Sequence, residues 1–244
     1  MYVWGDNTFG QIIGSKAAFV SEPMLLKDFK QVYVDKVISG KNHLVAFTGE
    51  KVYSWGCNKE KQLFCNTGEL CMVQAGDLFP QSEAIIDVEA YDNYTAVLIS
   101  GCKIVKSGEV KKVIHVPSNT ELVKLCVSSL AIHALSILGV LFSIQLSKVG
   151  KNMHYKMQVT REDVSDIFSG FYASAIDKNS NLLKLDPELS LIKDISCVRS
   201  ARLNENFSLI TSGVEKIPWV PCSQLSSLFE VSQDLVQESI VRFT

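Results

Sequence analysis

The chain of 244 residues is 47% hydrophobic and 20% charged, and its formal net charge is −2. This composition is that of a folded globular protein with a sizeable core, and it excludes a chain that is disordered throughout. Because basic and acidic residues are mixed along the chain, we expect neither a nucleic acid nor a membrane surface as a partner.

A strand followed by a turn is the first predicted element, and the chain contains it twice. Residues 2–12 and 53–63 share Tyr, Trp, Gly, Asn and Gln at five of eleven positions, at an offset of 51 residues. Residues 37–47 resemble residues 88–98 at the same offset. Repeats of this length are typical of propellers and solenoids. We interpret each copy of the first motif as an inner strand of a repeat and the turn that follows it.

Fainter copies of the second motif follow at residues 125–135, 167–177 and 204–219. The residues that open one strand of each unit are spaced by 51, 51, 38, 41 and 34 positions: Tyr2, Tyr53, Ile104, Phe142, Leu183 and Ile217. Short apolar strands that recur every ~40 to 50 residues between Gly, Asn and Asp turns are typical of propeller blades. The sequence therefore predicts an all-β fold, a β-propeller of five to six thin blades over residues 1–221, as a closed ring or an open arc.

The segment of residues 125–147 contains no formally charged residue and is long enough to span a bilayer. It also contains serines, a histidine and a glutamine, and Gly139 divides it into two parts of strand length. We therefore predict two buried strands joined by a turn. A single-pass membrane segment is the alternative hypothesis.

The C-terminal residues 222–244 are predicted to form a separate unit, an amphipathic α-helix with Ser223 as its N-cap. Its apolar residues recur at steps of three and four positions: Leu225, Leu228, Phe229, Leu235, Val236, Ile240 and Phe243. We expect this helix to pack on the propeller, and a partner-binding helix or the start of a second domain is the alternative. Just before it, residues 217–220 are predicted to pair near residues 2–4 and so to close the ring.

Four motifs at the start of the chain resemble the repeat of the regulator of chromosome condensation family: VWGDNTFGQIIG, EPMLL, KVISGKNHLVAFT and KVYSWGCN. The positions of this sequence that match the family repeat are Trp4, Gly5, Asn7, Gly10, Gln11, Gly40, His43, Trp55, Gly56, Asn58 and Gln62. In the second unit Lys61 stands in place of a Gly, while Tyr91 and Tyr94 replace a Gly and a His. The resemblance is specific over residues 2–58 and fainter after residue 101.

We interpret the matching positions as structural. Gly permits positive φ in tight connections, Asn stabilises turns, and Trp or Tyr fills the space between blades. His43 is likewise interpreted as a structural histidine, because the sequence places no Ser, Cys or carboxylate partner near it. The resemblance implies a seven-bladed propeller, for which blades of ~50 residues need more than 244 residues. We therefore expect thinner or fewer blades here.

The family resemblance also implies functions. Its best-known member promotes nucleotide exchange on the small GTPase of nuclear transport and contacts nucleosomes, and other members use the propeller to bind small GTPases, coat proteins, ciliary components or ubiquitin-pathway proteins. The lack of a basic tail or face argues against chromatin binding by this chain. We therefore predict a non-catalytic protein-interaction module, with a guanine-nucleotide exchange factor for a small GTPase as the alternative.

Sequence motifs of catalysis and cofactor binding are absent, because the chain contains no GxSxG, HExxH, P-loop or GxGxxG pattern. The acidic stretch at residues 161–166 is interpreted as a solvated face. The seven cysteines are an odd number without a close CxxC pair, which predicts a reduced intracellular compartment, cytoplasmic or nuclear, and no metal site. We expect no catalytic residue, no cofactor and, since the chain starts with the strand-like YVW, no secretory signal.

Overall fold

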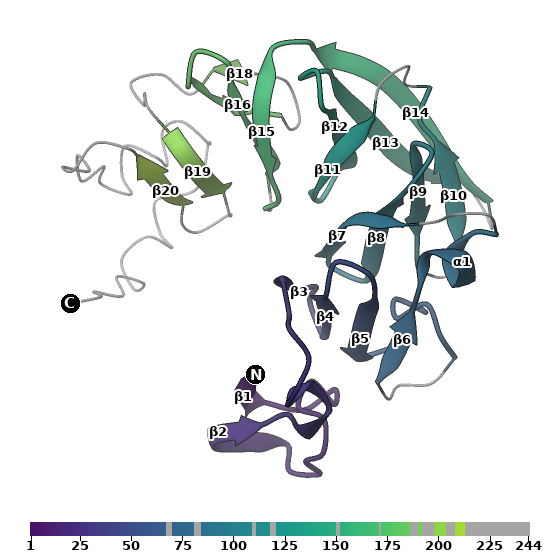
Figure 1. Cartoon of the computed structure of the whole chain (residues 1–244), viewed down its shortest axis with the longest axis vertical. Coiled ribbons are helices and arrows are strands. Elements are labelled where there is room, and N and C mark those ends of the chain that lie inside the picture. The colour runs from purple at the N-terminus through teal and green to yellow at the C-terminus, as the bar shows by residue number, and fades with distance from the viewer. Residues whose placement is uncertain are drawn as a thin grey trace.

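The computed structural model describes residues 1–212 apart from residues 67–69, 81–83, 109–110, 118–120, 150–151, 171, 186–189, 192–197 and 204–207. The described strands form six antiparallel sheets that follow one another along an arc (Figure 1). Four of these sheets contain four strands, and a two-stranded sheet stands at each end of the series. The all-β propeller architecture that the repeats predict is therefore present. The predicted C-terminal helix and residues 217–220 lie outside the described residues.

The strands are numbered in chain order. The first two-stranded sheet contains β1 (Tyr2–Asp6) and β2 (Phe19–Leu25), and a 3-10 helix (Lys27–Phe29) follows it. The last sheet contains β19 (Val198–Leu203) and β20 (Ser208–Ser212). A short helix, α1 (Ala75–Leu78), follows β6. The four-stranded sheets have these bounds: β3 (Lys36–Ser39), β4 (His43–Phe47), β5 (Val52–Gly56) and β6 (Cys71–Val73); β7 (Ile85–Tyr91), β8 (Tyr94–Ile99), β9 (Lys103–Lys106) and β10 (Lys112–His115); β11 (Leu122–Val127), β12 (Ala131–Ser136), β13 (Leu141–Val149) and β14 (Asn152–Arg161); β15 (Val164–Phe168), β16 (Ser174–Asp177), β17 (Leu182–Lys184) and β18 (Ser190–Leu191).

Each four-stranded sheet begins at the inside of the arc and ends at its outside, so that β3, β7, β11 and β15 are the innermost strands. The residues expected to open a strand of each unit lie in β1, β5, β9, β13 and β17: Tyr2, Tyr53, Ile104, Phe142 and Leu183. The interpretation of this motif as an inner strand is wrong. β5 is a third strand that pairs with β4 and β6, because the hairpin β3–β4 precedes it and takes the two inner places.

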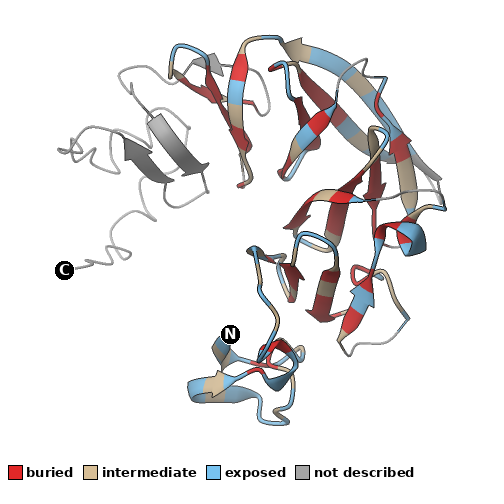
Figure 2. Ribbon diagram, in the orientation of Figure 1, coloured by how far each residue is buried: buried red, intermediate tan, exposed pale blue. Residues whose placement is uncertain are grey.

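The hydrophobic core is divided into layers that lie between neighbouring sheets, and Figure 2 shows that the residues of the central strands are mostly buried. One layer contains Val45 of β4 and Val97 of β8, and the next contains Leu98 of β8 and Ile132 of β12, all of them fully buried. Burying an aliphatic side chain of this size contributes about 1.5–3 kcal/mol. Because adjacent residues of a strand point to opposite faces, a sheet in the middle of the arc contributes to two layers. Its stability therefore depends on both neighbours.

The uncharged segment of residues 125–147 folds into the sheet β11–β14. It contains the end of β11, all of β12 and most of β13, so the two predicted strands are accompanied by part of a third. Gly139 lies in the turn between β12 and β13, where the sequence predicts it. Leu125, Ile132 and Ile144 are fully buried, which explains why the segment carries no charge. No helix among the described residues is long and apolar enough to cross a membrane.

Lys106, the last residue of β9, is buried between sheets although it carries an ammonium group. The ammonium donates a hydrogen bond to the Ser107 carbonyl oxygen at 3.0 Å and lies 4.4 Å from the centre of the Tyr94 ring. Burial lowers the pKa of Lys106 from its ordinary value of 10.5 to about 8, because desolvation disfavours the charged form. The charged Lys106 therefore opposes folding at neutral pH.

The substitution Lys106→Met is expected to raise the free energy of unfolding at neutral pH by about 1–2 kcal/mol. One unit of pKa corresponds to ~1.4 kcal/mol, and the lost ring and carbonyl contacts offset part of the gain. In the wild type the unfolded chain binds more protons between about pH 8 and pH 10.5, so stability rises with pH over that window, and the variant lacks this rise. Urea unfolding of both proteins across this range measures the difference. Equal or lower stability of the variant at neutral pH would contradict the prediction.

Candidate functional site

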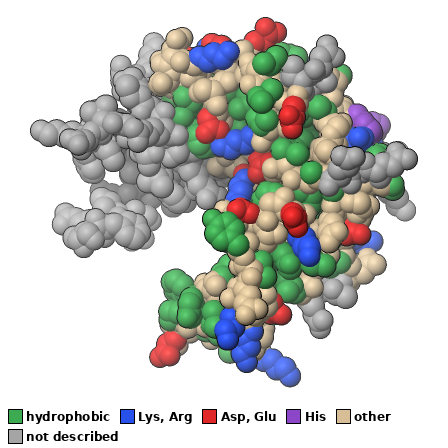
Figure 3. All heavy atoms as spheres, viewed as in Figure 1, with side chains coloured by type: hydrophobic (Ala, Val, Ile, Leu, Met, Phe, Trp, Pro, Cys, Tyr) green, Lys and Arg blue, Asp and Glu red, His purple; other side chains and the backbone are tan. Residues whose placement is uncertain are grey.

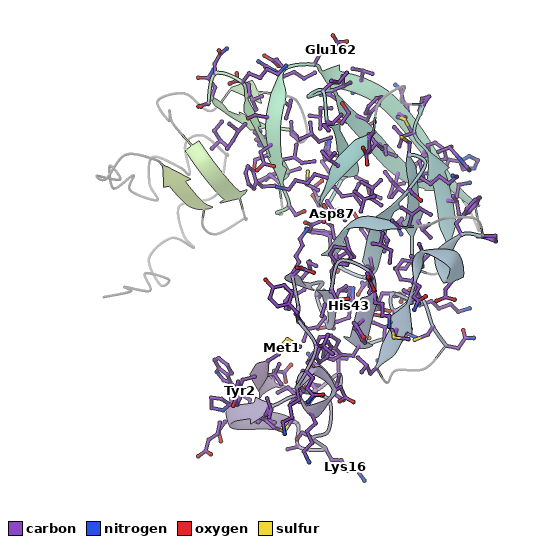
Figure 4. All side chains as sticks on the ribbon, in the orientation of Figure 1. Met1, Tyr2, Lys16, His43, Asp87 and Glu162 are labelled. Atoms are coloured by element: carbon purple, nitrogen blue, oxygen red, sulfur yellow. The ribbon has the colours of Figure 1, made fainter. Side chains whose placement is uncertain are left out.

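The innermost strands β3, β7, β11 and β15 each place one charged residue at an equivalent position. These residues lie opposite Phe47, Leu98, Leu135 and Ile176 of the adjacent strands, and they are Lys36, Asp87, Lys124 and Asp166. Their charges alternate in sign from sheet to sheet. Figure 3 shows basic and acidic side chains side by side along the inner rim of the arc, and Figure 4 labels Asp87 at this rim.

The ion pairs of Lys36 join the first four-stranded sheet to the second. The Lys36 ammonium lies 2.9 Å from Asp87 Oδ1 and 2.5 Å from Glu89 Oε1. It also donates a hydrogen bond to the Val88 carbonyl oxygen at 2.9 Å. These three contacts use the three N–H donors that a lysine ammonium has.

Further contacts extend this series of links to the next two sheets. The second carboxylate oxygen of Asp87 accepts a hydrogen bond from the Leu125 amide of β11 at 2.8 Å. Lys124 of β11 pairs with Asp166 of β15 at 2.6 Å, and its ammonium lies 4.7 Å from the centre of the Phe168 ring. The four innermost strands are therefore linked one after another by charged groups.

Burial and charge act in opposite directions on the groups around Lys36. Burial raises the pKa of Glu89 above its ordinary value, because desolvation outweighs the attraction of Lys36 for the carboxylate. Burial would lower the pKa of Lys36, but the carboxylates of Glu89 and Asp87 more than offset this effect and raise it. The two carboxylates thus hold Lys36 in its charged form, and Lys36 in turn is the cation that pairs with both of them.

A pocket of about 280 Å³ opens between the innermost strands, and we call it the axial pocket. It is lined by residues 36–39 of β3, Glu89 of β7, Lys124 of β11 and residues 167–169 at the end of β15. Apolar and charged side chains thus share its wall. Because the side chain of Lys124 is 33% exposed and pairs with Asp166 through one contact, its ammonium can donate to a ligand in the pocket.

The predicted repeat positions lie outside the axial pocket, and several of them are in the loops after β1 and β5. Asn7 and Asn58 each accept, through Oδ1, a hydrogen bond from the amide five residues further on, at 2.7 and 3.1 Å. Gln11 and Gln62 each accept, through Oε1, a hydrogen bond from the amide two residues before them, at 2.9 Å. The same pattern of side-chain hydrogen bonds therefore occurs within each of the two loops.

The repeat glycines lie in β1, in the loop after it, in the turn after β3 and at the end of β5. Three of them have positive φ: Gly5, Gly10 and Gly56. Lys61, which replaces the glycine in the second unit, also has a positive φ of 56°, a conformation that favours glycine. A Cβ at Gly40 would meet the His43 ring and would lie 2.8 Å from the Asp92 carbonyl oxygen.

His43 is buried between the sheets β3–β6 and β7–β10, away from the inner rim (Figure 4). Its Nε2 lies 3.0 Å from Thr95 Oγ1 of the second sheet. Burial lowers the pKa of His43 from 6.5 to about 4, so the imidazole is neutral at physiological pH. In this position it joins two sheets.

The two repeat tryptophans occupy equivalent positions in opposite environments. Trp55 of β5 is 1% exposed, whereas Trp4 of β1 is 62% exposed. Trp55 Nε1 donates a hydrogen bond to the Gln11 carbonyl oxygen at 2.8 Å, and its ring centre lies 5.5 Å from that of Phe29. The first sheet and the residues next to it therefore cover the indole of Trp55, which belongs to the second sheet.

The charged residues of the inner rim were missed by the sequence analysis, although a signal was present. Lys36, Asp87, Lys124 and Asp166 are the residues immediately before the aligned segments 37–47, 88–98, 125–135 and 167–177. Asp166 also belongs to the acidic stretch 161–166, which was interpreted as solvated. The Asp166 side chain is 36% exposed, and its carboxylate also pairs with Lys124 of the neighbouring sheet, a contact that the sequence did not predict.

The repeated four-stranded sheets and their inner rim define an arc of a β-propeller. No protein-family model matches the chain. Among curated proteins, the X-linked retinitis pigmentosa GTPase regulator of the dog, Canis lupus familiaris, is 36% identical over 101 residues, and that of Homo sapiens is 32% identical over 112 residues. The aligned regions cover 40% and 45% of this chain but only 10% and 11% of the length of these relatives.

Solved structures agree with this fold. Prp20p from Saccharomyces cerevisiae, also called yeast RCC1, superposes with a TM-score of 0.69 at 18% identity, over 87% of this chain and 64% of that chain. Human WBSCR16 superposes with a TM-score of 0.67 at 12% identity, over 87% of this chain and 67% of that chain. The chain is therefore similar to RCC1-like proteins in its β-propeller fold, as the motifs of its first two units predict.

Proposed function

We propose that this protein is a non-catalytic interaction module, which binds a protein partner on the face of the arc around the axial pocket. The observation that carries the proposal is the convergence of side chains from four successive sheets on one small pocket. Its volume of about 280 Å³ lies just below the range of ~300–1,000 Å³ that is typical of small-molecule sites. Such a volume suits a single side chain inserted by a partner, with Lys124 as its polar contact.

The rigidity of the pocket supports this proposal. Lys36 is anchored by three contacts, and Asp87 bridges β3 to β11. A pocket whose walls are already fixed loses little conformational entropy when a partner binds. A protein of the same fold also binds proteins. Prp20p, or yeast RCC1, binds Gsp1p and histones, and its structure has been solved with Kap60 bound to it.

A photo-crosslinking amino acid in place of Ser39, which is exposed and lines the axial pocket, tests this proposal. We expect it to capture a protein whose capture is lost with Lys124→Gln, because this change removes the ammonium and keeps a polar side chain. The controls are the same crosslinker at Ser21, which is exposed on β2, and the substitution Lys16→Gln at another exposed lysine. Equal capture from Ser39 and Ser21, or capture that persists with Lys124→Gln, would contradict the proposal.

A small GTPase is the favoured class of partner, because the curated relatives are GTPase regulators by name. An exchange factor needs no catalytic base, since it acts by binding the nucleotide-free GTPase more tightly than the loaded form. Release of a fluorescent nucleotide from a panel of small GTPases tests this candidate. Acceleration that is reduced by Lys124→Gln is expected, and no acceleration for any GTPase would exclude exchange activity while leaving the interaction module open.

A further inference from the structure

The outer strand of the sheet β11–β14 differs in length from the other outer strands. β14 has 10 residues, whereas β6, β10 and β18 have 3, 4 and 2 residues. Among the described strands β14 pairs with β13 alone, and it is the last strand of its sheet. Its outer edge is therefore a long row of unpaired backbone groups on the outside of the arc (Figure 1).

The β13–β14 hairpin is held in place through one of its faces. Leu146 and Met157 pack on the core layer that contains Ile114 of β10. The Lys112 ammonium of β10 lies 5.6 Å from the centre of the Tyr155 ring of β14. β10 and β14 belong to different sheets and are not paired. The neighbouring sheet thus supports β14 from its face, and the backbone groups of the outer edge stay unpaired.

The charges along this edge are of one sign. Residues 122–161, which include the whole sheet β11–β14, contain five Lys or Arg and no Asp or Glu. Of these, Lys124 belongs to the inner rim, and Arg161 pairs with Asp163 and Asp177. His154 and Lys156 are exposed on β14, and Lys111 is exposed next to β10. In a chain whose net charge is −2, Lys156 and Lys111 therefore give this outer edge a positive charge.

We propose that the outer edge of β14 binds an acidic, extended segment of a partner protein as an added strand. The unpaired backbone groups can hydrogen-bond an extended peptide, and Lys156 can attract its carboxylates. Tyr155 and Val159, which are 38% and 52% exposed, offer apolar contacts to alternate side chains of the added strand. A nucleic acid or a membrane surface would interact with the basic side chains but would not hydrogen-bond the backbone groups of the strand edge. An extended peptide can interact with both.

A fluorescent, capped peptide of alternating Val and Glu is the probe, and its anisotropy is measured with the full chain. We expect saturable binding that weakens with added salt. Lys156→Glu should weaken this binding about fivefold, and Lys156→Gln less so. Lys16→Glu makes the same charge change on an exposed loop of the first sheet (Figure 4) and should leave the affinity unchanged. Lys124→Gln should also leave the affinity for the peptide unchanged, because the edge of β14 is separate from the axial pocket. The proposal for the edge and the proposed function can therefore fail independently of each other.

Peptide variants test the binding mode without any change to the protein. A peptide with N-methyl groups on alternate amides keeps its charge but cannot pair along a strand edge, so its affinity should fall about tenfold or more, ~1.4 kcal/mol. Unchanged affinity of this peptide would overturn the proposal, as would equal binding of a peptide of alternating Val and Lys. Equally strong binding of a DNA duplex or of phosphatidylserine vesicles would also overturn it. So would the absence of binding by the Val and Glu peptide at low salt.

Discussion

Trp55→Ala is expected to lower the free energy of unfolding by about 3–5 kcal/mol, whereas Trp4→Ala is expected to lower it by less than about 1 kcal/mol. The two residues are the same amino acid at equivalent positions of the repeat. Trp55 is 1% exposed and Trp4 is 62% exposed. The pair therefore separates the effect of burial between sheets from the effect of the residue type.

The large effect at Trp55 has two physical causes. Removal of the indole leaves a cavity between the first two sheets. The ring centre of Phe29 lies 5.5 Å from that of Trp55 and would line this cavity. It also leaves the Gln11 carbonyl oxygen without the donor that lies at 2.8 Å in the wild type. Trp4 loses mainly solvent-exposed surface.

Urea unfolding of the two variants and the wild type provides the measurement. Far-ultraviolet circular dichroism, which reports strand content, should be nearly the same for all three folded proteins, since each change removes one side chain and no strand. Similar destabilisation by both substitutions would show that the first sheet does not cover Trp55 in solution as it does in the structure.

Lys36→Met is expected to lower the free energy of unfolding by about 3 kcal/mol, because it leaves two buried carboxylates without their shared partner. The side chains of Asp87 and Glu89 are 11% and 9% exposed. The methionine fills a similar volume, so the effect reports on charge more than on packing. Lys41→Met, at an exposed lysine of the turn between β3 and β4, is the matched control and should change stability by less than about 0.5 kcal/mol.

The effect of Lys36→Met should depend on pH in a defined direction. Burial already raises the pKa of Glu89 in the wild type, and the loss of Lys36 removes the attraction that opposes this rise. A carboxyl whose pKa is higher in the folded than in the unfolded chain makes stability increase as the pH falls. The difference between variant and wild type is therefore largest at neutral pH and decreases on acidification.

The double variant with Lys36→Met and Glu89→Gln supplies a second check. Because it removes one of the two unpaired charges, it should be more stable at neutral pH than Lys36→Met alone, and its stability should depend less on pH. A single variant with wild-type stability at neutral pH, or with a defect that grows on acidification, would contradict the assigned role of Lys36.

The sequence predicts the blades better than it predicts the axial pocket. The strand-opening residues from Tyr2 to Leu183 all lie in strands, and the four from Tyr53 to Leu183 lie in the third strand of a sheet. A repeated apolar pattern reflects the repeated need to pack against neighbouring sheets. The order of strands from inside to outside was not predicted correctly. Periodicity locates a strand along the chain, but the pairing of β5 with β4 and β6 depends on the sheet as a whole.

The inner rim that borders the axial pocket was not predicted, because its charged residues do not repeat in kind. Lys36 and Asp87 occupy one position of the repeat with opposite charges, and so do Lys124 and Asp166. A search for identical residues at a fixed offset passes over such a position. Alternation of charge at the position becomes informative once the strands are known to be neighbours around a common rim, since opposite charges then meet at ion-pair distance.

The first sheet, β1–β2, packs through one face only, with Val3 and Met24 against the layer that contains Trp55. A two-stranded sheet is marginally stable by itself, so this sheet can detach while the sheets that follow remain folded. Local unfolding of this kind costs less free energy than global unfolding. It would bring the indole of Trp55 from the interior into water, which makes Trp55 a natural fluorescent reporter of opening at this end of the arc.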